Sequence, residues 1–236
     1  MFLSYQKISF IAHFLEQHLT LCHTKHMFGL SKKELAMLKK LSTPQKIQDF
    51  LDALPQNYEK GGETYLSPRR VLREQKAHCI EGALLAAVAL WLQGEEPFIL
   101  DLKTVDIEID SDHVVALYKK NGYWGAISKT NHAVLRYRDP IYKTPRELAL
   151  SYFHEYFLTT NGQKTLRSYS RPISLKRFGT DWVTAEDNLV HIAEALDNVP
   201  HFPLIPTGTE HHLRPASPVE RTAGSIPEWA KEDPRT

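Results

Sequence analysis

The cysteine at position 79 stands where a thiol could act as a nucleophile. In the stretch KAHCIEGALLAAVALW, Cys79 separates polar residues from a long apolar run. A thiol in the first turn of a helix meets free backbone N–H groups and the positive end of the helix dipole, which favour the thiolate and lower its pKa. The same N–H groups could hold the oxyanion of a tetrahedral intermediate. The structural alternative is a small buried core residue, which free cysteines commonly are.

A nucleophilic thiol needs a base within hydrogen-bond reach, and His113 is the candidate. His113 opens the stretch HVVALYKKNGYWGAIS, in which two β-rich arms flank Asn121-Gly122. That dipeptide is typical of a two-residue type I′ hairpin turn. Taken alone, His113 would be read as a structural histidine, because the chain has 12 of them. The functional reading therefore depends on the pair of Cys79 and His113.

The predicted hairpin register selects the residue that orients the imidazole. With the turn at 121–122, Lys120 pairs with Tyr123. In this register Ser128 lies on the same face of the hairpin as His113 and is its diagonal neighbour. Ser128 is therefore the first candidate for the third position. Asn131, three residues further on, is the second. Asp112 adjoins His113 but points to the opposite face of an extended strand.

The elements that must position these residues indicate an α+β fold. Residues 78–93 are apolar on nearly all sides, which predicts a central buried helix that ends at Gly94. A short apolar segment, 97–103, predicts a strand, and the hairpin adds two more. Apolar spacing and capping signals predict helices elsewhere, at 10–21, 35–41, 42–55, 67–75, from 144–145 onward and at 184–199.

These elements suggest four regions along the chain. They are a helical N-terminal region (1–66), a core that holds the site (67–142), a C-terminal helical region packed on the core (143–199), and a proline-rich tail (200–236). We expect the tail to lie against the body or to be partly disordered.

Composition excludes some classes of protein. The 236 residues include 29 Lys and Arg and 28 Asp and Glu, a formal net charge of +1, which gives no reason to expect a nucleic-acid or membrane partner. Two cysteines, Cys22 and Cys79, cannot form a disulfide framework, which suits a reducing compartment. The first residues lack the uninterrupted apolar stretch of a secretory signal. We therefore expect a cytoplasmic protein; its oligomeric state is open.

Two other clusters of residues could form sites. His18, Cys22 and His26 would share one helix face, but their spacing matches no structural zinc motif, so no metal or other cofactor is expected. Four basic residues come just before Cys79: Arg69, Arg70, Arg73 and Lys76. They either form a solvated face or supply a positive field near the thiol.

The stretches HCIEGALLAAVALWLQGEEPFIL and DHVVALYKKNGYWGAIS together resemble the core of the transglutaminase-like superfamily, over about residues 67–131. The resemblance implies a papain-like arrangement, with a central buried helix packed on a small antiparallel sheet. It matches Cys79 to the nucleophile, His113 to the base and Trp124 to a tryptophan near the acidic position. That acidic position is Ser128 here, which departs from the family pattern. Gln75 is a candidate oxyanion donor, by similarity to a glutamine of papain-like enzymes.

Two functions follow from this reading. The first is a cysteine-dependent acyl-transfer enzyme acting on a peptide or protein amide, with hydrolysis favoured because water needs no second pocket. The alternative is a binding or scaffold protein that keeps the fold without the chemistry, since serine brings no negative charge to the imidazolium. A thiolate–imidazolium pair depends less on its third member than a serine nucleophile does, which keeps the enzyme reading open.

Overall fold

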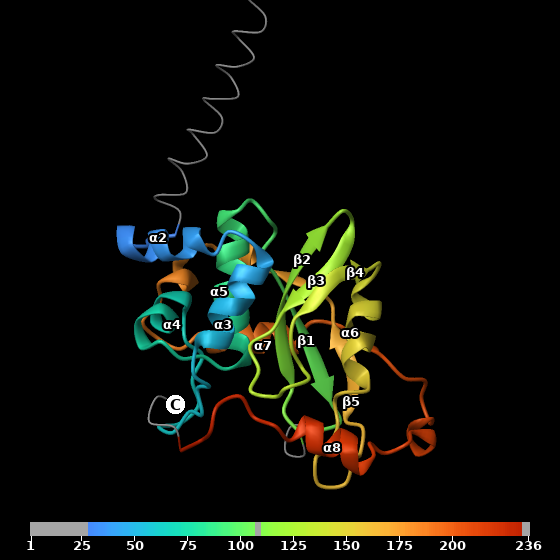
Figure 1. The fold of residues 1–236 in the computed structure, drawn as a ribbon. Helices are drawn as coiled ribbons and strands as arrows, with labels where there is room; N and C mark the ends of the chain where they lie inside the picture. Colours follow the sequence, from blue (N-terminus) through green and yellow to red (C-terminus); the bar gives the residue numbers. More distant parts are fainter. Residues whose placement is uncertain (1–27, 107–109, 233–236) are drawn as a thin grey trace, which may run out of the picture.

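The structure, a computed structural model, describes residues 28–106 and 110–232 and has an α+β fold (Figure 1). The predicted helix at 10–21 and the cluster of His18, Cys22 and His26 lie outside the described residues. The seven α-helices in the described part are α2 (Lys32–Lys40), α3 (Pro44–Ala53), α4 (Pro68–Glu74), α5 (Cys79–Leu92), α6 (Pro145–Phe153), α7 (Val190–Asp197) and α8 (Pro218–Gly224). The strands are β1 (Phe98–Thr104), β2 (His113–Lys120), β3 (Tyr123–Ile127), β4 (Arg138–Tyr142), β5 (Leu166–Ser170), β6 (Ile173–Ser174) and β7 (His201–Pro203).

The strands form one antiparallel sheet in the order β4-β3-β2-β1-β5-β7, and β6 also pairs with β1. The predicted hairpin is β2–β3, with Lys120 opposite Tyr123 as the register required. Asn121 and Gly122 have φ of 53° and 84°, the two positive values that a type I′ turn needs. The hairpin register was therefore predicted correctly from the turn dipeptide.

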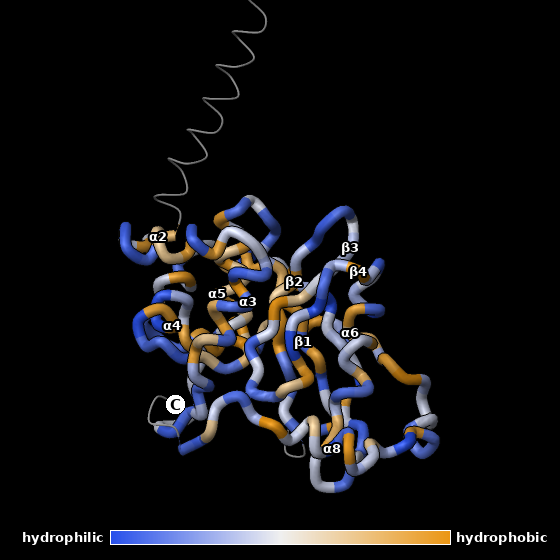
Figure 2. The backbone as a smooth tube through the Cα atoms, viewed as in Figure 1, coloured by the Kyte–Doolittle hydropathy of each residue, from blue (hydrophilic) through white to orange (hydrophobic). Residues whose placement is uncertain are grey.

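Helices cover both faces of this sheet (Figure 1). Alternation along β2 sends Val114 and Ala116 into one core, shared with α2–α5 and α7, and Val115 and Leu117 into a second core, shared with α6. Figure 2 shows the apolar colouring gathered on α5 and on the strands beside it. Both faces of the sheet are therefore buried, and the ends of its strands are where side chains can reach a cleft.

The central helix is α5, and the sequence predicted it. Its positions from Ile80 to Leu90 are all buried, as expected of a helix with no polar face. Gly94 follows the C-cap with φ of 88°, the left-handed conformation that stops a helix. None of the helices in residues 28–106 and 110–232, α5 included, is long and apolar enough to cross a membrane.

The C-terminal half contains more strand than the sequence indicated. The range 143–199, expected to be helical, contains β5 and β6 as well as α6 and α7, and α7 begins only at Val190. The tail packs on the body through β7 and α8. Strands of two to five residues carry almost no periodic signal, and pairing with the free edge of β1 decides their conformation.

Gly82 lets α5 approach the end of the hairpin closely. A Cβ at this position would overlap the Cβ of Lys129, a buried side chain whose Nζ donates to the Leu54 carbonyl at 2.6 Å. Glycine is normally unfavourable inside a helix by about 1 kcal/mol relative to alanine. Close packing against Lys129 is the reason that this position lacks a side chain.

We predict that Gly82→Ala lowers the free energy of unfolding by about 1–3 kcal/mol, because overpacking outweighs the gain in helix propensity. Denaturant unfolding of the full chain measures the change. The matched control is Gly61→Ala, whose added Cβ meets no atom within 4 Å, and its change should stay within about 0.5 kcal/mol. A Gly82→Ala variant as stable as the wild type would contradict the packing argument.

Candidate active site

Cys79 and His113 line the same cleft, which has a volume of about 640 Å³. Its walls come from the loop after α3, the first turn of α5, the ends of β1 and β2, the segment that follows β3, and α7. Residues 34 positions apart in sequence are thus brought together, because the N-terminus of α5 and the first residue of β2 meet at one end of the sheet.

Cys79 is the first residue of α5 and is partly buried. Burial raises the pKa of its thiol, but hydrogen bonds and positive charge from His113 and His78 outweigh burial and lower the pKa to about 5. A thiol with this pKa is ionised at neutral pH. The sulfur is therefore a thiolate in an accessible cleft, the form that reacts with electrophiles.

His113 is buried, and one of its ring nitrogens is tied to Ser128. Its Nε2 lies 2.7 Å from the Ser128 Oγ, and that hydroxyl donates to the Leu135 carbonyl at 2.7 Å. Because a hydroxyl has a single proton, Ser128 must accept from His113 Nε2–H. The arrangement fixes the tautomer and leaves Nδ1 as the nitrogen that can take a proton. The structure thus brings together Cys79, His113 and Ser128.

Ser128 is itself clamped by Gln48 of α3. The Gln48 side chain accepts from the Ser128 N–H at 2.9 Å and donates to the Ser128 carbonyl at 2.8 Å. Both residues are buried, so this double contact fixes the chain just beyond β3. Gln48 was not identified from the sequence, because a single glutamine in a helix gives no signal of a partner 80 positions away.

Asn131, the second candidate for orienting His113, is engaged elsewhere. Its amide donates to the Tyr58 hydroxyl at 2.6 Å and the Trp229 carbonyl at 3.1 Å, and its Oδ1 accepts from the Trp229 N–H at 2.8 Å. Asn131 therefore fastens the C-terminal segment to the body. Asp112 is also not bonded to His113, since its Oδ1 accepts from the backbone and hydroxyl of Thr104.

Gln75 does not line the cleft. It caps α4 in the left-handed conformation, with φ of 55°, and its amide donates to the Leu72 carbonyl at 2.6 Å. Four residues before Cys79, the chain is still finishing α4, so Gln75 is held away from the sulfur. The oxyanion role suggested for Gln75 therefore has no support from the geometry.

A different glutamine, Gln56, does line the cleft. Gln56 pairs with Ala77 in a parallel bridge, beside the segment that leads into Cys79. Its Oε1 is buried and has no hydrogen-bond partner in the part of the chain that the structure describes. No sequence pattern points to Gln56, because only the fold brings it next to residue 77.

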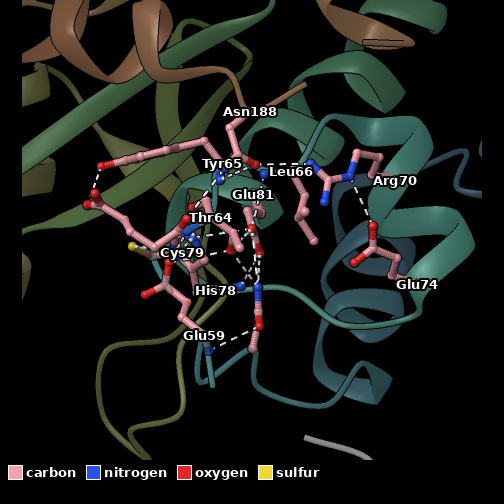
Figure 3. Close-up of polar contacts among 12 residues, drawn as sticks. Glu59, Thr64, Tyr65, Leu66, Arg70, Glu74, His78, Cys79, Glu81 and Asn188 are labelled. Atoms are coloured by element: carbon pink, nitrogen blue, oxygen red, sulfur yellow. Dashed lines mark hydrogen bonds and ion pairs between the residues drawn. The ribbon is translucent and has the colours of Figure 1, made fainter. Parts of the chain in front are cut away.

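His78 is a second imidazole at the sulfur, and the sequence analysis did not identify it. It is the N-cap of α5, and its Nδ1 lies 3.9 Å from the Cys79 Sγ (Figure 3). Its Nε2 donates to the Thr64 carbonyl at 2.8 Å. Burial lowers the pKa of His78, but contacts with Cys79 and Glu81 outweigh burial and raise the pKa to about 11.

Glu81, in the first turn of α5, is fully buried and accepts several hydrogen bonds. Figure 3 shows them converging on its carboxylate. The donors are the N–H groups of His78 (2.9 Å) and Leu66 (3.0 Å), the Thr64 hydroxyl (2.8 Å) and the Asn57 amide (3.1 Å). Burial raises the pKa of Glu81, but the contacts with His78 and Asn57 outweigh burial and lower the pKa. Glu81 is therefore a carboxylate.

Other charges near the cleft have partners of their own. The upstream arginines form ion pairs, Arg69 with Glu34, Arg70 with Glu74 and Arg73 with Glu186, and none of them lines the cleft. Three carboxylates that do line the cleft have ligand oxygens within 4.8 Å of one another, and they belong to Asp101, Asp112 and Asp197. Asp101 is already paired with His201 at 3.0 Å.

Searches of models of known protein families and of curated proteins found no match for this chain.

We predict that Ser128→Ala releases the His113 ring, because the acceptor that the described residues supply for its Nε2–H is removed. Nitrogen NMR of His113, recorded at a pH where the ring is neutral, should change from a single Nε2–H tautomer to a mixture. The control is Asn131→Ala, which should leave the tautomer unchanged, since the Asn131 amide contacts Tyr58 and Trp229. If Asn131→Ala alters the tautomer and Ser128→Ala does not, the assignment of the orienting residue is wrong.

Proposed function

We propose that the protein is a cysteine-dependent acyl-transfer enzyme that hydrolyses amide or peptide bonds, with a core of the transglutaminase-like type. The observation that carries the proposal is the chain of contacts at the cleft. A helix-terminal thiolate faces an imidazole, and the far nitrogen of that imidazole is held by Ser128 at 2.7 Å. Nucleophile, base and orienting group are the three parts that covalent acyl transfer needs.

In the proposed reaction, the Cys79 thiolate attacks the carbonyl carbon of an amide and forms a tetrahedral oxyanion. His113, protonated at Nδ1, gives that proton to the leaving nitrogen as the C–N bond breaks, and a thioester remains on Cys79. Neutral His113 then takes a proton from water, which attacks the thioester. Collapse of the second tetrahedral intermediate releases a carboxylic acid, and the starting thiolate and imidazolium are restored.

Two groups are placed to stabilise the oxyanion. The backbone N–H of Cys79, at the first position of α5, has no partner within the helix. The amide of Gln56 lines the cleft beside the segment before Cys79. Donors fixed in advance around a developing negative charge contribute strongly to catalysis. We assign the side-chain part of this role to Gln56 in place of Gln75.

The test uses p-nitrophenyl acetate as a probe of acyl transfer, because it needs no knowledge of the natural substrate. We predict a burst of p-nitrophenolate and an acetyl adduct on Cys79, detected by mass spectrometry. Cys79→Ser should abolish both, and His113→Ala should slow the burst by about 10²–10⁴-fold, the usual contribution of a general acid–base group. If wild-type protein gives no burst, the proposed acyl-transfer activity is wrong, and the binding or scaffold function remains.

Two glutamine variants make a matched pair in the same assay. Gln56→Ala should slow the burst by about 10²–10³-fold, the cost of losing one oxyanion donor. Gln75→Ala should leave it near the wild-type rate, because the Gln75 amide bonds to the Leu72 carbonyl outside the cleft. The opposite pattern would return the role to Gln75.

A further inference from the structure

We propose that His78, backed by the buried carboxylate of Glu81, is the standing positive partner of the Cys79 thiolate, while His113 moves the proton. The inference rests on the proposed function and adds a residue to it. It assigns different tasks to the two imidazoles that contact the sulfur: His78 has a carboxylate partner in Glu81, whereas the side-chain partner described for His113 is the Ser128 hydroxyl.

The proton on the far nitrogen of His78 is fixed by its contacts. Nε2 donates to the Thr64 carbonyl at 2.8 Å and lies 3.3 Å from Oε1 of Glu81. A carbonyl oxygen can only accept, so Nε2 carries a proton in every state of the ring. The nitrogen that can gain or lose a proton is therefore Nδ1, the one that faces the sulfur at 3.9 Å.

The surroundings of Glu81 favour an imidazolium at His78. Four donors point at the Glu81 carboxylate, which stabilises its ionised form, and a buried anion needs a positive partner. Among the described residues, the ion pairs of Glu81 include His78 but no lysine or arginine. Glu59, whose Oε1 lies 3.7 Å from His78 Nε2, adds further negative charge. A neutral His78 would leave the Glu81 carboxylate without a cation among its ion-pair partners in the described residues.

Charge is balanced at each stage under this assignment. Before attack, the thiolate and Glu81 are negative, and His78 and His113 are positive. In the acyl-enzyme, the sulfur and His113 are both neutral, and His78 still neutralises Glu81. An imidazole with a carboxylate partner therefore keeps its proton throughout the reaction. His113, whose partner is an uncharged serine, is free to give its proton away.

The titration of Cys79 and His78 also depends on the other charged and titratable groups that face them. His78 is faced by Cys79, Glu81 and Glu59, and its ring lies edge-on to Tyr65 with the centroids 6.4 Å apart. The sulfur is faced by both imidazoles and by Tyr156. Burial raises the pKa of Tyr156 well above its usual value, so this phenol stays neutral across the range tested.

The test is the rate of alkylation of Cys79 by iodoacetamide as a function of pH, in the full chain. In wild-type protein the rate should reach half its plateau near pH 5, the pKa to which the two imidazoles lower the thiol. His78→Asn should move the midpoint up by about one to two units, the effect of losing a neighbouring opposite charge. At pH 6 its rate should fall about twofold for a one-unit shift and about tenfold for a two-unit shift, and at pH 10 both proteins should react equally.

The control is His132→Asn, another histidine that lines the cleft but has its Nδ1 near the Gly224 carbonyl. It should keep the wild-type midpoint. If His78→Asn also keeps that midpoint while the acetyl burst still depends on His113, the role of His78 is overturned and the proposed function stands. If wild-type protein gives no burst, the proposed function fails whatever His78 does.

A second measurement reads the charge of the His78 ring directly in the wild-type chain. Proton NMR of the His78 ring in the wild-type chain, assigned by comparison with His78→Asn, should show the ring protonated up to at least pH 9, since its pKa is raised to about 11. A ring that titrates near the ordinary value of 6.5 would overturn the inference. Glu81→Gln, where it folds, should bring the His78 pKa down toward that value.

Discussion

The buried carboxylate of Glu81 is the constraint on which the site depends. It lies in the first turn of α5 and is fully buried, so its charge must be satisfied by neighbours. Those neighbours come from the loop between α3 and α4, through Asn57, Thr64 and Leu66, and from the N-cap His78. One side chain thereby fixes the loop, the start of the helix and the imidazole beside Cys79. A wall of the cleft and the surroundings of the thiol depend on the same network.

A second set of contacts holds the other imidazole that interacts with the sulfur, His113. The β2–β3 hairpin brings Ser128 beside His113, and Gln48 of α3 clamps the backbone of Ser128. The orientation of His113 therefore depends on an N-terminal helix as much as on the hairpin. An uncharged serine can orient His113 if the positive charge that stabilises the thiolate comes from His78, which is itself paired with Glu81. Under the proposed function, this assignment explains how a serine can stand where the transglutaminase-like family, which the sequence resembles, has an acidic residue.

The sequence predicted what local geometry determines. The position of Cys79 follows from the change from polar to apolar residues, and that of Ser128, diagonally across from His113, follows from the turn at Asn121-Gly122. Contacts between distant segments were not accessible, because no periodicity records that Gln56 lies beside Ala77. The short strands β5–β7 were missed for the same reason. His78 was overlooked although it adjoins Cys79, since its importance depends on a carboxylate that only folding buries around it.

We infer that Cys79 is a thiolate at neutral pH because the two neighbouring imidazoles hold it in that form. The ionisation can be followed by the ultraviolet absorbance of the thiolate, titrated against pH, with the spectrum of Cys79→Ser subtracted to remove every other chromophore. We predict a single midpoint near pH 5. A midpoint near 9.0, the ordinary value for a thiol, would contradict it, because Cys79 would then be a buried cysteine of a non-catalytic fold.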